Sequence, residues 1–173
     1  MHFKDIYRNM RRATFYVIWA FLMASVLVSC HQSHKKELDL AYALAKSNPD
    51  SALVFLNHID QVKLSEEDMA KYALTYYMAQ DKSGLDVDND SLIRIAYDWY
   101  GEHQDDSLYA TALYYMGKYF LQNDSMEQAK VCLDKSYSLS DSLHDMSLKC
   151  LALDKLIEVE EQLAPYKALN DAK

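Results

Sequence analysis

The chain has 173 residues, the length of one domain, and its 50% hydrophobic and 25% charged residues exclude disorder of the chain as a whole. Its formal net charge is −8, and because the first 29 residues are basic, the remainder is more acidic still. An acidic body is repelled by phosphate backbones, so we do not expect nucleic-acid binding. With only 3 glycines and 2 prolines, long helices joined by short polar loops are favoured over strands.

The N-terminal segment has the order of an export signal. Residues 1–12 are basic, residues 13–29 carry no charge, and the run ends in Leu27-Val28-Ser29-Cys30. This ending resembles the lipobox of bacterial lipoproteins, in which a small residue precedes the cysteine that is acylated. By that resemblance residues 1–29 are a lipoprotein signal peptide, and Cys30 is the lipidation site and mature N-terminus.

Two alternatives to the lipid anchor stay open. The first alternative is an uncleaved transmembrane helix, although the apolar run is at the short end of the roughly 17–25 residues that span a bilayer. The second alternative is a helix buried in the protein core. Several acyl chains on one cysteine would anchor firmly, since each buried CH₂ contributes about 0.8 kcal/mol. Lipid anchor and spanning helix both place the body outside the cytoplasm, in the bacterial cell envelope and facing the periplasm, behind a polar tether at residues 30–36.

The first expected helical hairpin covers residues 37–60. Apolar residues recur there at helical spacing in two stripes, and Asn48-Pro49 separates them, with proline suited to the first helical position. The stripes are Leu38, Ala41, Tyr42 and Ala45, then Ala52, Leu53, Leu56 and Ile59.

A second hairpin is expected over residues 66–101. Ser65 and Asp68 resemble a capping box at its start, a loop covers residues 81–90, and Asp90 is the predicted cap of the next helix. The two stripes are Ala70, Ala73, Leu74 and Tyr77, then Leu92, Ile93, Ala96, Trp99 and Tyr100.

Three further helices follow. Asp105 with Asp106 offers a cap for the first, Ser125 and Gln128 form a capping-box pattern for the second, and the third runs over 146–163 and ends before Pro165. Residues 164–173 are then a short tail. First helices of successive hairpins would begin near residues 37, 66, 107 and 146, which is the spacing of helical repeat arrays.

Residues 110–143 resemble one tetratricopeptide repeat. The positions that carry the resemblance are Leu113, Met116, Gly117, Phe120, Ala129, Leu133 and Ser136. Gly117 and Ala129 would let two antiparallel helices approach closely, while Phe120 and Leu133 would fill the wedge between them. Ser136 and Asp141 depart from the usual alanine and proline.

The resemblance implies an all-α domain over residues 37–163, in which antiparallel hairpins stack as a short superhelix similar to tetratricopeptide repeats. Because the final helix has no second helix of comparable quality, part of its apolar face should stay exposed. The implied function is a membrane-anchored protein–protein interaction module that grips a peptide or helix in a concave groove. A sensor fragment of a longer membrane signalling or transcription regulator is the alternative, and an enzyme of unknown type is a third class.

The sequence contains an acidic loop and a pair of cysteines, two features that can form a chemical site. Asp86, Asp88 and Asp90 are arranged like part of a calcium loop, but Ser91 and Tyr97 stand where an EF-hand needs glycine and glutamate, which favours a solvated loop. Cys132 and Cys150 lie on consecutive helices, where an oxidising compartment permits a disulfide, although cysteine is also a common core residue. We predict no catalytic residue, cofactor or metal, because no motif for one is present.

Tyrosine is the residue type that points most to a partner. Of the 14 tyrosines many crowd the middle hairpins, and aromatic residues are enriched at protein interfaces. About half must lie in the core. Tyr72, Tyr76, Tyr109 and Tyr114 fall nearer the polar helix faces and are our candidates for a partner-binding surface.

Overall fold

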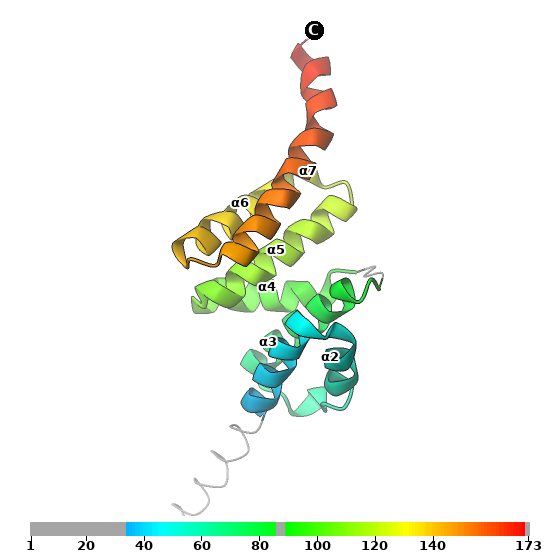
Figure 1. Ribbon diagram of the computed structural model, residues 1–173, viewed down its shortest axis with the longest axis vertical. Helices are drawn as coiled ribbons and strands as arrows, with labels where there is room; N and C mark the ends of the chain where they lie inside the picture. Colours follow the sequence, from blue (N-terminus) through cyan, green and yellow to red (C-terminus); the bar gives the residue numbers. More distant parts are fainter. Residues whose placement is uncertain (1–33, 86–88, 172–173) are drawn as a thin grey trace, which may run out of the picture. The chain divides into compact units, whose positions relative to one another are not determined.

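The computed structural model describes residues 34–85 and 89–171, and in this part of the chain every regular element is helical and no strand occurs (Figure 1). The all-α class expected from the scarcity of glycine and proline is therefore confirmed. Two compact units are distinguished, residues 1–40 and residues 41–173. The features discussed below belong to the second unit.

The helices follow one another along the chain and are joined by short loops. They are residues 34–47, α2 (Pro49–Leu56), the 3₁₀ helix η1 (Gln61–Lys63), α3 (Glu66–Lys82), α4 (Ser91–His103), α5 (Asp106–Gln122), α6 (Met126–Ser142) and α7 (Met146–Asp171). From α2 onward each α-helix packs on the next one, and α5 also contacts α7. This is the packing of stacked helical hairpins, and α3, α5 and α7 begin within one residue of the predicted positions.

Helix starts are fixed by local hydrogen bonds at three positions, of which Ser65 and Asp105 were predicted from the sequence and Asn48 was not. The side chains of Asn48, Ser65 and Asp105 accept hydrogen bonds from the backbone N–H groups of Ser51, Asp68 and Leu108 at 3.1–3.2 Å. Each bond satisfies a donor that the first helical turn leaves without a partner.

Two further residues occupy the predicted N-cap positions, but their side chains form no capping hydrogen bond. Asp90 precedes α4, but its carboxylate accepts two hydrogen bonds from the Arg94 guanidinium. These charge-assisted bonds are stronger than a neutral hydrogen bond and form in place of the cap. Ser125 precedes α6, but its hydroxyl donates to the carbonyl oxygen of Asn123 at 3.3 Å instead of capping the helix.

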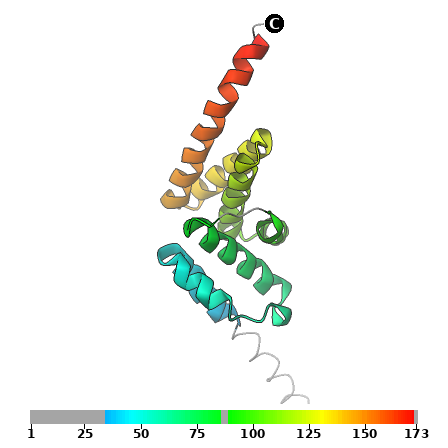
Figure 2. The ribbon, with the colours of Figure 1, turned by 90° about the vertical axis from the view of Figure 1, so that its right-hand side faces the viewer.

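The final helix is longer than predicted. It continues through Pro165 to Asp171, and both views show it running on past α5 and α6 (Figures 1 and 2). A proline removes one backbone donor and crowds the carbonyl four residues earlier, but its neighbours can keep helical dihedral angles. The same helix exposes the apolar residues Met146, Leu151, Leu153 and Ile157, which confirms that part of its apolar face is uncovered.

Helices α5 and α6 approach each other closely at Gly117, as the sequence predicts. A Cβ atom added there would lie 2.6 Å from Leu133 Cγ and 3.4 Å from the carbonyl oxygen of Ala129, so only glycine fits without a shift. Ser136, the departure from the repeat pattern, is fully buried and donates a hydrogen bond to the Ala110 carbonyl at 2.8 Å. It therefore ties α6 to α5.

The two described cysteines are free thiols. Cys132 is buried and Cys150 is exposed, so the disulfide considered above is not formed. Burial raises the pKa of Cys132 to about 11, which keeps that thiol protonated and unreactive near neutral pH.

Candidate functional site

The first helices of the hairpins enclose a groove of about 270 Å³. Its lining comes from residues 41–47, α3, α5 and the segment that opens α7. Its buried floor includes Thr111, Tyr114, Tyr115 and Leu148, and its exposed rim includes Lys46, Lys82, Asp145, Ser147 and Leu151.

Aromatic contacts hold the floor of this groove. Tyr114 and Tyr115 meet edge to face with ring centroids 5.0 Å apart, and Tyr77 packs on Tyr115 at 5.9 Å. The hydroxyl groups of Tyr42 and Thr111 lie 3.4 Å apart, which links residues 41–47 to α5. Burial raises the pKa of Tyr114 to about 12, with the nearby Asp81 carboxylate adding to the effect, so its phenol stays protonated at neutral pH.

Four lysines at almost constant sequence spacing lie on the helices that form this groove; two of them line it, and the other two lie near its floor residue Tyr114. They are Lys46, Lys82, Lys118 and Lys155. The ammonium group of Lys82 donates to the Lys46 carbonyl at 3.3 Å, which makes these two neighbours. Farther along, Lys118 lies 6.0 Å from the Tyr114 ring centroid and the Lys155 charge lowers the pKa of the same phenol, so both flank Tyr114. We call these four residues the lysine row.

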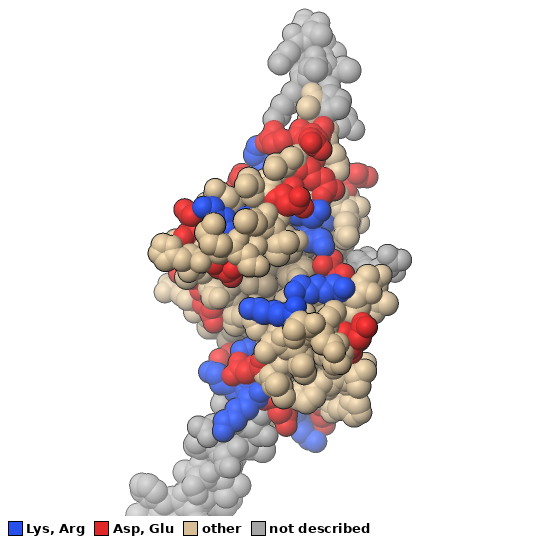
Figure 3. Space-filling model, in the orientation of Figure 1, with Lys and Arg blue, Asp and Glu red and all other residues tan. Residues whose placement is uncertain are grey.

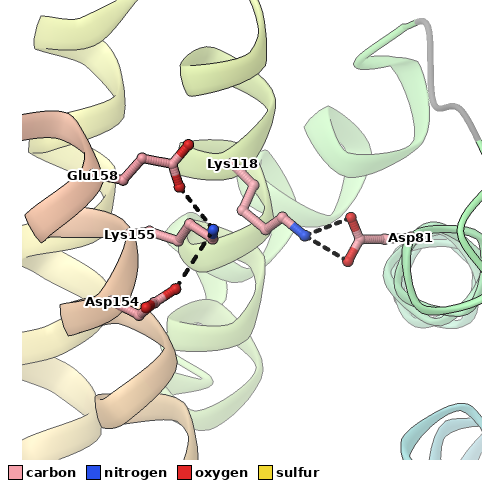
Figure 4. A network of polar contacts seen from close by, with 5 residues as sticks. All are labelled: Asp81, Lys118, Asp154, Lys155 and Glu158. Atoms are coloured by element: carbon pink, nitrogen blue, oxygen red, sulfur yellow. Dashed lines mark hydrogen bonds and ion pairs between the residues drawn. The ribbon is translucent and has the colours of Figure 1, made fainter. Parts of the chain in front are cut away.

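The two halves of the lysine row differ in charge compensation. Lys118 donates to both oxygens of Asp81 at 2.6 and 2.8 Å, and Lys155 donates to Glu158 at 2.8 Å (Figure 4). Lys46 and Lys82 have no carboxylate partner among the described residues; the Lys46 ammonium lies instead 4.5 Å from the Tyr42 ring centroid. The uncompensated positive charge is therefore at the Lys46 and Lys82 end.

This charge stands out because the chain as a whole is acidic. Figure 3 shows basic atoms gathered in a band across the middle of one face, with acidic atoms mostly above and below. A groove with an aromatic floor and two uncompensated ammonium groups can bind an acidic, partly apolar chain segment.

The structure corrects the placement of two candidate tyrosines. Tyr72 is 2% exposed and Tyr114 is 5% exposed, so their expected position on polar helix faces is wrong. Tyr72 is covered because Gln61 from η1 donates to its hydroxyl at 2.7 Å, and Tyr114 forms the groove floor. Tyr76 and Tyr109 are half-buried. Of the four only Tyr114 lines the groove, and a partner-binding role for the others stays a prediction.

The lysine row was missed from the sequence, although a signal exists. Lys46, Lys82 and Lys118 are each 36 residues apart, and Lys155 follows 37 residues later. A search for polar residues repeating at the hairpin period would have found them. Apolar stripes do not reveal them, because lysines at such positions are typical of an ordinary solvated helix face.

The described residues define an all-α protein with hairpins packed in a helical-repeat-like arrangement. No protein-family model, no curated protein and no solved structure matches the chain. Within residues 34–85 and 89–171 no helix is long and apolar enough to cross a bilayer, and no group of His, Cys, Asp and Glu is placed to hold a metal. The predicted signal, the Cys30 lipidation site and the Asp86–Asp88 part of the acidic loop lie outside the described residues.

Proposed function

We propose that this chain is a membrane-anchored lipoprotein that binds an extended, acidic segment of another protein along the lysine row, through hairpins like tetratricopeptide repeats. The observation that carries the proposal is the juxtaposition of Lys46 and Lys82, both without a carboxylate partner in the described part of the chain, at the edge of an aromatic groove. The proposed role is binding, with the partner's carboxylates replacing the missing counter-charges.

The geometry supports an extended segment more than a compact ligand. The row crosses residues 41–47, α3, α5 and α7, so a ligand that meets all of it must run across the hairpins. Carboxylates at the Lys46 and Lys82 end would find ammonium donors, and apolar side chains would pack on Tyr114, Tyr115 and Leu148.

A peptide titration tests the groove. A labelled peptide of alternating leucine and glutamate is added to the full chain in detergent, and its anisotropy is followed. We expect saturable binding that Lys46→Glu with Lys82→Glu weakens about tenfold or more, a loss of about 1.4 kcal/mol or more. The matched control is Lys63→Glu with Lys135→Glu, which changes the net charge equally at exposed lysines outside the row. Equal weakening by both double variants would show that only overall charge matters and would sink the proposal.

The membrane anchor has its own test, independent of the groove. Lipidation of Cys30 predicts a mature protein without residues 1–29, with acyl mass on its first residue. Cys30→Ala should leave the chain unacylated and longer by the signal, as intact-mass spectrometry of the purified protein would show. An unacylated Cys30 in the parent protein would rule out the lipid anchor and leave the spanning helix and the buried core helix as alternatives.

A further inference from the structure

A second groove lies on other residues of the chain and carries the opposite charge. It has a volume of about 470 Å³ and lies where the segment before α3 and the first turn of α3 meet α4. Leu64, Met69, Ile95 and Trp99 give it apolar walls. We call it the Trp99 groove. None of its lining residues lines the groove of the lysine row.

The sequence of α4 explains why this face is available. Ile93, Ala96 and Tyr100 form the buried face, which leaves Ile95, Trp99 and Glu102 to share another face at helical spacing. Trp99 is fixed in place because His103 stacks on its indole with ring centroids 3.7 Å apart. The His103 Nδ1 atom also lies 2.8 Å from the Trp99 carbonyl oxygen, which holds the imidazole there.

The rim of the Trp99 groove is acidic, and its carboxylates form no ion pair within the described residues. Glu66, Asp98 and Glu102 all line it and are exposed, and no lysine or arginine does. None of the three carboxylates has an ion-pair partner in the described residues, whereas Asp81, Asp141 and Glu158 elsewhere each pair with a lysine. The groove thus combines three carboxylates that form no ion pair, of which Asp98 feels the charge of Arg94, with an ordered aromatic ring and an apolar wall.

We infer that the Trp99 groove binds a basic, amphipathic segment of a partner protein, with an arginine side chain over the Trp99 ring and a neighbouring apolar side chain against Met69 and Ile95. A guanidinium is attracted by the negative face of an indole and donates to carboxylates in a planar fork. In the Trp99 groove the indole of Trp99 supplies the first attraction, and the carboxylates of Asp98 and Glu102 supply the second. This inference goes beyond the proposed function, because it names a second site for a segment of opposite charge.

The chain carries a built-in probe for this site. It has two tryptophans, so Trp19→Phe leaves Trp99 as the only one. The full chain with this substitution, in detergent, is titrated with an unlabelled peptide of alternating leucine and arginine while tryptophan emission is recorded. We expect a saturable change in Trp99 emission, and none with the matched peptide of leucine and glutamate. Asp98→Asn with Glu102→Gln should weaken the arginine peptide about tenfold.

Two controls separate the site from general attraction to an acidic protein. Asp124→Asn with Asp134→Asn removes two exposed carboxylates elsewhere and should leave the affinity unchanged. Lys46→Glu with Lys82→Glu should leave it unchanged as well, so failure of the lysine-row proposal would not be mistaken for failure here. Circular dichroism confirms that each variant is folded. The inference is overturned by the absence of a saturable emission change, by equal binding of the glutamate peptide, or by equal weakening in the Asp124 and Asp134 control.

Discussion

Single residues in left-handed backbone conformation turn the chain between successive helices. Gln104, Asp124 and His144 have φ angles of 56°, 55° and 57°, and they lie in the connections that follow α4, α5 and α6. A residue with a Cβ atom is strained in this conformation, and glycine is not. Each connection therefore stores a small amount of strain that one substitution can release.

Gln104→Gly should raise the free energy of unfolding by about 0.5–1 kcal/mol, because the relief of strain exceeds the extra entropy of the unfolded chain. Urea denaturation measures the change. Gly84, with a φ of 69° and open space around its Cα, is the matched control, and Gly84→Ala should lower stability by a similar amount. A loss of stability in Gln104→Gly would contradict the strain argument.

Gly117 should tolerate no side chain. Alanine favours helices by about 1 kcal/mol over glycine, but its Cβ atom would lie 2.6 Å from Leu133 Cγ. We expect the clash to dominate and Gly117→Ala to lose about 1–3 kcal/mol in urea denaturation. At Gly101 an added Cβ would meet only the Tyr109 ring, at 3.3 Å, so Gly101→Ala should be close to neutral. Two equally stable variants would show that the α5–α6 contact is not tight.

At the scale of elements, two helix starts with similar sequence patterns differ in whether the predicted cap forms. Ser65 caps α3 as its sequence indicates, because the bond to the Asp68 N–H involves only neighbouring residues. The similar pattern at Ser125 fails because the turn around Asp124 directs the hydroxyl to the Asn123 carbonyl. Asp124 precedes the four-residue pattern from Ser125 to Gln128, so the pattern alone cannot predict the effect of that turn.

Matched substitutions test this difference between the two helix starts. Ser65→Ala should cost about 0.5–2 kcal/mol of unfolding free energy, since it removes the acceptor of the Asp68 N–H. Ser125→Ala should cost only a few tenths of a kcal/mol, because its hydroxyl caps no helix. Thermal melts of the two variants give the comparison, and a larger loss at Ser125 would show that its hydroxyl caps α6 in solution.

For the whole molecule, the fold was more predictable than the site. Apolar stripes and the small residue Gly117 specify the helices and one close contact between them, because both depend on spacing along one or two helices. Burial of Tyr72 and Tyr114 depends on residues from other elements, such as Gln61 in η1, so a stripe alone could not reveal it. The four lysines of the lysine row likewise lie on four different helices, so their proximity depends on how these helices pack.

Buried tyrosines should make the molecule sensitive to alkali. Burial raises the pKa of Tyr77, Tyr100 and Tyr115, and it raises that of Tyr114 to about 12. Unfolded tyrosines ionise near pH 10, so above that pH the unfolded chain has lost protons that the native chain retains. Stability is then full below pH 10 and falls at about 1.4 kcal/mol per pH unit for each such tyrosine as pH rises toward 12. Urea midpoints at pH 8 to 11 measure it, and a flat profile would contradict the burial of these phenols.

The central claim, that a partner segment lies along the lysine row, is tested most directly by site-specific photocrosslinking in living cells. A photoreactive amino acid replaces in turn Ser147 and Leu151, which are exposed at the groove rim, and Val54, which is 62% exposed on α2 and outside the groove. We predict one discrete adduct from Ser147 and Leu151, lost when Lys46→Glu and Lys82→Glu are added, and no such adduct from Val54. The same adduct from all three positions, or none from the two rim positions, would contradict the account.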